Sequence, residues 1–179
     1  QALVTRRYAG EPIAYLTQTR EFYGRSFAVS ADVLIPRSET ELIVDIVREK
    51  FGRDAAIRIL DMGTGSGCLA ITLALELPSA EVTALDVSAA ALDMAARNGR
   101  SLGGNVRFLA SDWFAAVTGE RFDLIVANPP YIAGDDPHLA QGDLRYEPRG
   151  ALTSGADGLE ALRDEASAPK PRTRLPSST

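Results

Sequence analysis

The chain has 179 residues, of which 45% are hydrophobic and 24% are charged, and its formal net charge is −5. This composition is typical of a globular domain and excludes a disordered or low-complexity chain. The acidic excess lies in residues 31–165, whereas a protein that holds a nucleic-acid backbone usually presents a basic surface. The single cysteine, Cys68, excludes an internal disulfide and fits a reducing compartment.

Targeting signals are not visible in the sequence. No basic segment followed by an apolar core stands near Gln1, and no apolar run is long enough to cross a bilayer. We therefore expect a cytoplasmic protein with no membrane association. Because the sequence begins with Gln1 rather than Met, we expect it to be a fragment or a processed form.

The first third of the chain predicts short elements. Aromatic and β-branched residues in short runs between Gly10 and Val29 predict a hairpin or a pair of short strands. Ser38 followed by Glu41 is a capping box, which predicts the start of a helix. The apolar residues expected to face the core from that helix are Leu42, Ile43, Ile46 and Val47.

From residue 57 onward, apolar strands alternate with helical stretches. The predicted strands are 57–61, 82–86, 106–109 and 122–127, and the predicted helices are 68–77 and 88–102. We expect Ser88 to cap the second helix and Gly103-Gly104 to end it. Strands separated by helices predict βαβ units, and so an α/β fold with a parallel sheet and right-handed crossovers. After Tyr131 we expect a long structured loop and a short helix at 159–166.

A glycine-rich loop, Asp61-Met62-Gly63-Thr64-Gly65-Ser66-Gly67, follows the first of these strands. Glycine allows close approach of the backbone to a ligand, and the next helix offers its free N–H groups. Cys68 replaces the last glycine of a dinucleotide fingerprint, and the Lys-Ser/Thr of a P-loop is absent. Asp86 ends the next strand, where a carboxylate can bind two ribose hydroxyls. The pattern favours S-adenosylmethionine as the cofactor over NAD or ATP.

Two further motifs follow the later strands. Asp112 and Trp113 are placed to contact an adenine, although a tryptophan at the edge of the core is the structural alternative. The run Asn128-Pro129-Pro130-Tyr131 can hold a substrate –NH2 group: the Asn128 side-chain oxygen and the Pro129 carbonyl accept its two hydrogens, and Tyr131 lies against the planar group. Fixing both hydrogens directs the nitrogen lone pair at a methyl group, so positioning carries the rate. The alternative is a rigid Pro-Pro turn.

Together these segments carry a family resemblance. The matching segments are Gly10–Tyr15, Leu34–Glu41, Leu60–Gly67, Asp112–Phe114, Asn128–Ile132, Asp136–Leu139, Gly142–Pro148 and Gly155–Leu159. Over about residues 5–163 the chain resembles the HemK/PrmC-type peptide chain release factor N5-glutamine methyltransferases. The resemblance implies a Rossmann-like class I S-adenosylmethionine-dependent methyltransferase. Such an enzyme methylates the side-chain amide nitrogen of the glutamine in the Gly-Gly-Gln motif of release factors.

The resemblance also implies roles for individual residues. The cofactor would contact Gly63, Thr64, Gly65, Gly67, Asp86, Asp112, Trp113 and Asn128. The glutamine amide would be bound by Asn128, Pro129, Pro130 and Tyr131, of which Asn128, Pro129 and Tyr131 would be catalytic. The substrate-side loop would contribute Glu147 and Pro148.

The expected organisation has three parts: a linker hairpin at 1–35, a partial methyltransferase domain at 36–166, and a disordered Pro/Arg/Ser tail at 167–179. The family's N-terminal helical domain and its last strands have no counterpart in this sequence, so the sheet is expected to be incomplete at its C-terminal side. The strand 122–127 is then expected to form an uncovered apolar edge.

Two other functions stay open. One is an adenine-N6 nucleic-acid methyltransferase that stacks a flipped base on Tyr131, although the acidic excess weighs against direct nucleic-acid binding. The other is a truncated, inactive remnant that binds cofactor without turnover. No metal site is expected, because His138 is the sole histidine and has no Cys or Asp partner at ligand spacing.

Overall fold

Four parallel strands form the central sheet of the computed structural model, which describes residues 1–167 and 172–173. The sheet order is β5-β4-β3-β7, with β3 at Arg58–Met62, β4 at Glu81–Asp86, β5 at Val106–Ala110 and β7 at Leu124–Ala127. All neighbouring pairs are parallel, as the alternation of strands and helices predicts. The order reverses at β3, where parallel sheets commonly bind ligands.

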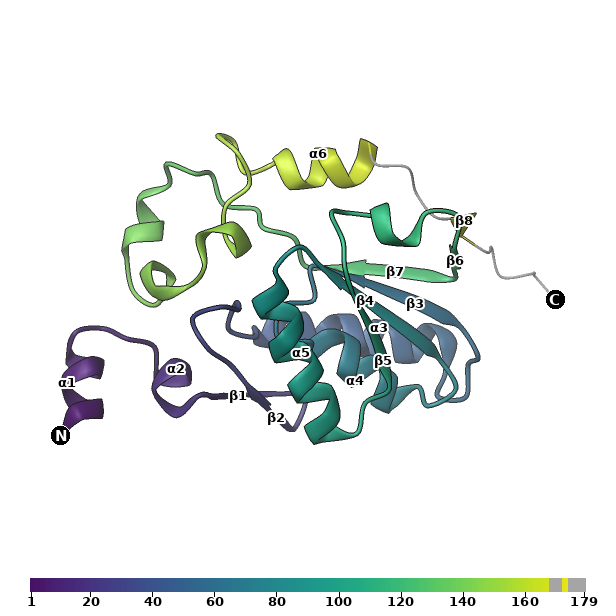
Figure 1. The fold of residues 1–179 in the computed structure, drawn as a ribbon, viewed down its shortest axis with the longest axis horizontal. Coiled ribbons are helices and arrows are strands. Elements are labelled where there is room, and N and C mark those ends of the chain that lie inside the picture. The colour runs from purple at the N-terminus through teal and green to yellow at the C-terminus, as the bar shows by residue number, and fades with distance from the viewer. Residues whose placement is uncertain (168–171, 174–179) are drawn as a thin grey trace.

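Helices cover both sides of this sheet (Figure 1). One side carries α3 (Glu41–Phe51), α4 (Cys68–Glu76) and α5 (Ala89–Leu102), and the other carries the 3-10 turn η2 (Ala115–Val117) and α6 (Glu160–Ser167). Ser88 caps α5 by accepting the Ala91 N–H, and Gly103 ends this helix with φ +77°, as predicted. The strands and helices of the βα region are therefore confirmed, with bounds that shift by one or two residues, except for the last strand.

The N-terminal segment contains two short helices and a hairpin. These are α1 (Ala2–Tyr8), α2 (Ile13–Thr17), β1 (Thr19–Phe22) and β2 (Arg25–Ala28). The hairpin is confirmed, but the run at 13–16, expected to be extended, is helical. Phe22 and Phe27 are fully buried and meet edge to face with ring centroids 6.1 Å apart. Because both rings belong to the main core, the hairpin is part of the same packed unit as the sheet.

The capping-box prediction is wrong. A 3-10 turn, η1 (Ser38–Thr40), precedes α3, and no side chain caps the helix. The Glu41 carboxylate instead accepts the backbone N–H of Tyr23 at 2.9 Å, so it holds the hairpin against the helix. The buried face of α3 consists of Val44 and Val47, whereas Leu42 and Ile46 are exposed.

The segment expected to be one strand at 122–127 is divided at Asp123. Its first part, β6 (Arg121–Phe122), pairs with β8 (Arg172–Thr173) outside the main sheet. The Asp123 carboxylate accepts the Arg58 N–H at 2.8 Å, and this contact separates β6 from β7. Within the described residues β7 pairs only with β3. Most of the tail expected at 167–179 lies outside the described residues.

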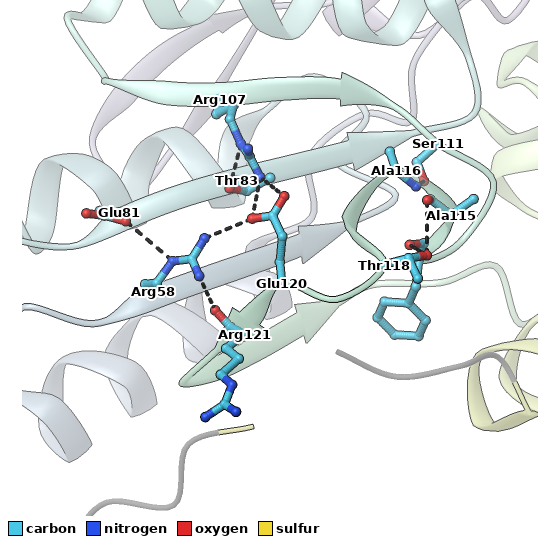
Figure 2. A network of polar contacts seen from close by, with 11 residues as sticks. Arg58, Glu81, Thr83, Arg107, Ser111, Ala115, Ala116, Thr118, Glu120 and Arg121 are labelled. Atoms are coloured by element: carbon cyan, nitrogen blue, oxygen red, sulfur yellow. Dashed lines mark hydrogen bonds and ion pairs between the residues drawn. The ribbon is translucent and has the colours of Figure 1, made fainter. Parts of the chain in front are cut away.

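Ion pairs join the amino ends of the strands, at the opposite end of the sheet from the loops that follow them (Figure 2). Arg58 contacts Glu81 at 3.4 Å and Glu120 at 2.8 Å, and Arg107 contacts Glu120 at 2.6 Å. Exposed pairs of this kind contribute little individually. Together, the two ion pairs of Glu120 hold the connection between β5 and β6 against the amino ends of β3 and β5.

The segment after β7 is the structured loop that the sequence predicts. It contains three 3-10 turns: η3 (Pro137–Ala140), η4 (Leu144–Tyr146) and η5 (Arg149–Ala151). A bridge between Ile132 and Thr153 brings its two ends together. The loop therefore returns to the carboxyl end of the sheet before α6 begins.

Candidate functional site

A cavity of about 400 Å³ opens at the carboxyl ends of the parallel strands. Each strand delivers a residue to it: Gly63 follows β3, Asp86 ends β4, Ser111 follows β5 and Asn128 follows β7. The segment before α3 and the loop after β7 complete its walls with Leu34, Pro36, Arg37, Thr40, Pro148, Gly150 and Ala151. The cavity lies where the strand order reverses, the usual ligand position in an open α/β sheet.

The glycine loop forms one wall of this cavity. Gly63 and Gly65 line it with φ values of +68° and +55°, a left-handed conformation that favours glycine. A Cβ added at either residue would meet no atom within 4 Å. The empty space in front of both residues lets a ligand approach the backbone directly.

Gly67 has a packing role between two helices. It does not line the cavity, and an added Cβ would lie 2.8 Å from Ile71 Cδ1 and 3.0 Å from Ala95 Cβ. Its left-handed φ of +79° starts α4, and the missing side chain lets α4 pack closely against α5. Cofactor contact by Gly67 stays a prediction.

We expect the substitutions Gly67→Ala and Gly65→Ala to differ in their cost. Both force an L side chain into a left-handed conformation, at about 1–2 kcal/mol. Gly67→Ala also overpacks the contact between α4 and α5, which adds roughly 1–3 kcal/mol. Urea unfolding of the two variants measures the difference. Equal destabilisation would contradict the packing role of Gly67.

Asp86 accepts a hydrogen bond from the glycine-rich loop. One carboxylate oxygen accepts the Gly65 N–H at 2.9 Å, and the other accepts the Ser88 N–H at 2.9 Å. The side chain also lines the cavity. A carboxylate oxygen has more than one lone pair, so Asp86 can hold the loop and still accept hydrogen bonds from a ligand hydroxyl.

Asp61 is a buried carboxyl group at the base of the cavity. It is 2% exposed and accepts the Thr64 hydroxyl at 2.6 Å. Burial raises the pKa of Asp61 to about 7, with a smaller contribution from the charge of Asp86, while the Thr64 hydrogen bond opposes the shift. Asp61 is the first residue of the glycine-rich loop in the sequence and is not among the predicted site residues.

The raised pKa predicts a pH-dependent stability. Between pH 3.8 and about 7 the folded chain keeps the Asp61 proton, which the unfolded chain has lost. The stability from this group is therefore full below the unfolded pKa and falls as the pH rises through that window. We expect Asp61→Asn to remove up to about 1.4 kcal/mol per pH unit of this slope. Urea unfolding across the window checks it, and identical slopes in both proteins would contradict it.

Asp112 and Trp113 line the cavity beyond the end of β5. Trp113 has a φ of +48°, which is rare for a residue other than glycine. The Ser111 hydroxyl donates to the Trp113 carbonyl at 2.8 Å and holds the turn in this conformation. The structure thus places both residues at the β5 end of the cavity, and their contact with an adenine stays a prediction.

The Asn128-Pro129-Pro130 run lines the cavity at the opposite edge of the sheet, directly after β7. Tyr131 does not line it and is 68% exposed. The first three members of the predicted tetrad therefore share one cavity with the glycine loop. Tyr131 lies outside, where its ring is accessible to a large partner.

Glu147 and Pro148, both expected on the substrate side, lie in different surroundings. Pro148 lines the cavity, whereas Glu147 is 4% exposed and does not. The Glu147 carboxylate accepts the Ile35 N–H at 3.0 Å and the Arg37 guanidinium at 2.6 Å. The partners of Glu147 in the structure are therefore groups of the protein itself. A direct contact between Glu147 and the substrate stays a prediction.

The segment 32–40 forms part of the cavity wall, although none of its residues is among the predicted site residues. Apart from the family resemblance of Leu34–Glu41, the sequence motifs give only Ser38 and Glu41 a role, as helix-capping residues. Arg37 lines the cavity as a consequence of its contact with Glu147, which lies 110 positions away in sequence. The family resemblance of Leu34–Glu41 was the one available signal for this part of the wall.

Among the described residues, no cluster of three or more potential metal ligands occurs, and no helix is long and apolar enough to span a membrane.

Two solved structures with a similar fold are methyltransferases. The Thermus thermophilus 16S rRNA N2 G1207 methyltransferase, in complex with AdoMet and guanosine, aligns with a TM-score of 0.54 at 23% identity, over 82% of this chain and 44% of that one. The Pyrococcus abyssi tRNA (uracil-54, C5)-methyltransferase, in complex with S-adenosyl-L-homocysteine, aligns with a TM-score of 0.50 at 23% identity, over 63% of this chain and 27% of that one. The fold is the Rossmann-like fold of class I S-adenosylmethionine-dependent methyltransferases.

Sequence comparison then defines the family. Residues 38–153 match the methyltransferase small domain model, and the chain belongs to this family. A Bordetella pertussis relative is 58% identical over 161 residues, 89% of this chain and 60% of the relative. An Escherichia coli K12 relative is 46% identical over 159 residues, 88% of this chain and 57% of the relative. Both relatives are named release factor glutamine methyltransferase. The chain spans about 60% of the length of such curated relatives.

Proposed function

We propose that the chain is the catalytic part of a release factor glutamine methyltransferase. It transfers the methyl group of S-adenosylmethionine to the side-chain amide nitrogen of the glutamine in a Gly-Gly-Gln motif. The observation that carries this proposal is the shared cavity: the glycine loop and the Asn128-Pro129-Pro130 run line the same space. The high identity with relatives named for this reaction supports the choice of glutamine as the acceptor.

The residues that line the cavity fit the cofactor. Gly63 and Gly65 leave space that any side chain would fill, which suits a ligand lying against the loop backbone. Asp86 would accept the ribose hydroxyls, and Asp112 and Trp113 would contact the adenine. When bound, S-adenosylmethionine supplies an electrophilic methyl group and leaves as the neutral thioether S-adenosylhomocysteine.

The chain's contribution to the reaction is to orient the acceptor nitrogen. An amide nitrogen is a weak nucleophile because its lone pair is delocalised into the carbonyl. The Asn128 side-chain oxygen and the Pro129 carbonyl would accept its two hydrogens and turn the lone pair toward the methyl carbon. The N–C bond forms as the C–S bond breaks, and the nitrogen then loses one proton to solvent. The exposed ring of Tyr131 would pack against the amide plane as the substrate enters.

The partner in this proposal is a protein. A release factor presents its glutamine on a loop, and the cavity receives that side chain next to Asn128. The reaction belongs with the translation machinery in the cytoplasm. The acidic excess of residues 31–165 favours a protein substrate over a nucleic-acid backbone.

A transfer assay tests the proposal. The chain is incubated with S-adenosylmethionine and a bacterial release factor, and peptide mass spectrometry locates any added methyl group. We expect methylation of the glutamine in the Gly-Gly-Gln motif, and none when that glutamine is replaced by alanine. Methylation of adenine in an added DNA or RNA duplex, with the release factor unmodified, would favour the nucleic-acid alternative. Cofactor binding without transfer to either substrate would favour the inactive remnant.

A further inference from the structure

Arg37 is the one basic residue among the described residues that line the cavity. The other charged residues of the lining are carboxylic acids: Asp32, Asp61, Asp86 and Asp112. Arg37 is therefore the one charged side chain of this lining that attracts a ligand carboxylate. The proposed function gives Arg37 no task in binding or chemistry.

The guanidinium of Arg37 is held in place before any ligand arrives. Its Nη2 atom lies 2.6 Å from Glu147 Oε1, and Glu147 Oε2 accepts the Ile35 N–H at 3.0 Å. The Glu147 side chain has no exposed surface, whereas the Arg37 side chain is one-third exposed. One edge of the guanidinium is thus fixed by a buried carboxylate, and a guanidinium has further N–H donors for a second acceptor.

The connectivity of the fold places Arg37 toward one end of the cavity. Glu147 belongs to the loop that follows β7, the strand that delivers Asn128. Asp112 and Trp113 follow β5, at the other edge of the sheet. A cofactor with its adenine at the β5 end and its ribose at Asp86 extends its amino-acid portion toward β3 and β7. That portion carries a carboxylate.

We propose that Arg37, positioned by Glu147, binds the α-carboxylate of the cofactor's amino-acid portion. This inference rests on the proposed cofactor. A planar guanidinium and a carboxylate form paired charge-assisted hydrogen bonds, which are stronger and more directional than those of a single ammonium group. Glu147 lowers the entropic cost of that contact because it fixes the Arg37 side chain in advance. The Arg37–Glu147 ion pair thereby couples the loop after β7 to cofactor binding.

Two ligands separate a carboxylate contact from a general effect on the site. S-adenosylhomocysteine and 5′-methylthioadenosine share the thioether nucleoside, but the second lacks the amino-acid carboxylate and amine. Isothermal titration of the chain with each ligand gives both affinities without any methyl transfer. We expect Arg37→Gln to weaken S-adenosylhomocysteine binding roughly 10- to 100-fold. Binding of 5′-methylthioadenosine should change by less than about twofold, because its contacts do not include Arg37.

Three further variants complete the test. Arg149→Gln removes an equal charge from an exposed residue two positions after Glu147 that does not line the cavity, and it should leave both affinities unchanged. Arg37→Lys should bind S-adenosylhomocysteine more tightly than Arg37→Gln does, because it keeps the positive charge. It should bind more weakly than the unmodified chain, because it lacks the paired N–H donors of a guanidinium. Glu147→Gln should weaken S-adenosylhomocysteine selectively but less than Arg37→Gln does. Thermal melts of every variant show whether the fold is retained.

The outcomes separate this inference from the proposed function. If Arg37→Gln weakens both ligands equally, Arg37 only supports the fold of the site and the inference is wrong. If Arg37→Gln weakens neither ligand, the carboxylate is bound elsewhere and the inference is again wrong. If the unmodified chain binds neither ligand, the proposed cofactor itself fails, and the inference fails with it.

Discussion

Asn128→Ala is expected to reduce methyl transfer by roughly 100- to 1,000-fold, the range seen when one preorganised hydrogen-bonding group is removed from an active site. The reason is positional: without the Asn128 oxygen, one N–H of the acceptor amide is unpaired and its lone pair is no longer directed at the methyl group. Cofactor binding should stay largely intact, because the glycine loop and Asp86 are unchanged. Initial rates with a release factor and calorimetry with S-adenosylhomocysteine measure the two effects separately.

A matched control for this variant is Asn105→Ala, which removes an exposed amide before β5. We expect normal transfer and normal binding in this control. Equal losses of transfer and of cofactor affinity in Asn128→Ala would contradict the assigned role, because they would indicate a general disturbance of the cavity.

Asn98→Leu is expected to destabilise the fold by about 3–5 kcal/mol, because it leaves three backbone groups unpaired, one buried and two partly buried, at about 1–3 kcal/mol each. The Asn98 amide donates to the carbonyls of Ala28 at 3.0 Å and Ser66 at 2.8 Å, and its oxygen accepts the Ala28 N–H at 2.8 Å. One side chain of α5 thus joins the hairpin to the glycine loop. Thermal and urea unfolding measure the change, which corresponds to a decrease in Tm of roughly 10 °C or more.

Thr72→Val is the matched control for a buried polar side chain. The Thr72 hydroxyl is fully buried in α4 and has no hydrogen-bond partner within the described part of the chain. Replacing it with a methyl group of similar shape removes an unsatisfied polar group, so we expect a neutral or stabilising change of about 1 kcal/mol. Similar unfolding free energies for Asn98→Leu and Thr72→Val would show that the Asn98 hydrogen bonds contribute nothing.

The elements of the βα region could be predicted because their signals are local. Ser88 as a cap, Gly103 as a terminator and apolar strands between helices each depend on neighbouring residues, and the structure confirms them. The predictions that failed depended on distant partners. Glu41 binds the hairpin instead of capping its own helix, and Asp123 interrupts an apolar run because it pairs with Arg58.

The sequence by itself determined the motifs that carry the chemistry and the succession along the chain of the strands that precede them. Glycines at 63 and 65, Asp86 and the Asn128-Pro129-Pro130 run reach one cavity because the carboxyl ends of parallel strands meet at one edge of the sheet. Tertiary structure alone decided which side chains face that cavity. Glu147 turns inward to Arg37, while Gly67 packs two helices together. The physical reason is that hydrophobic periodicity reports the neighbours of a residue along the chain, whereas the partner of a buried charge or the contact of a glycine is set by segments far away in sequence.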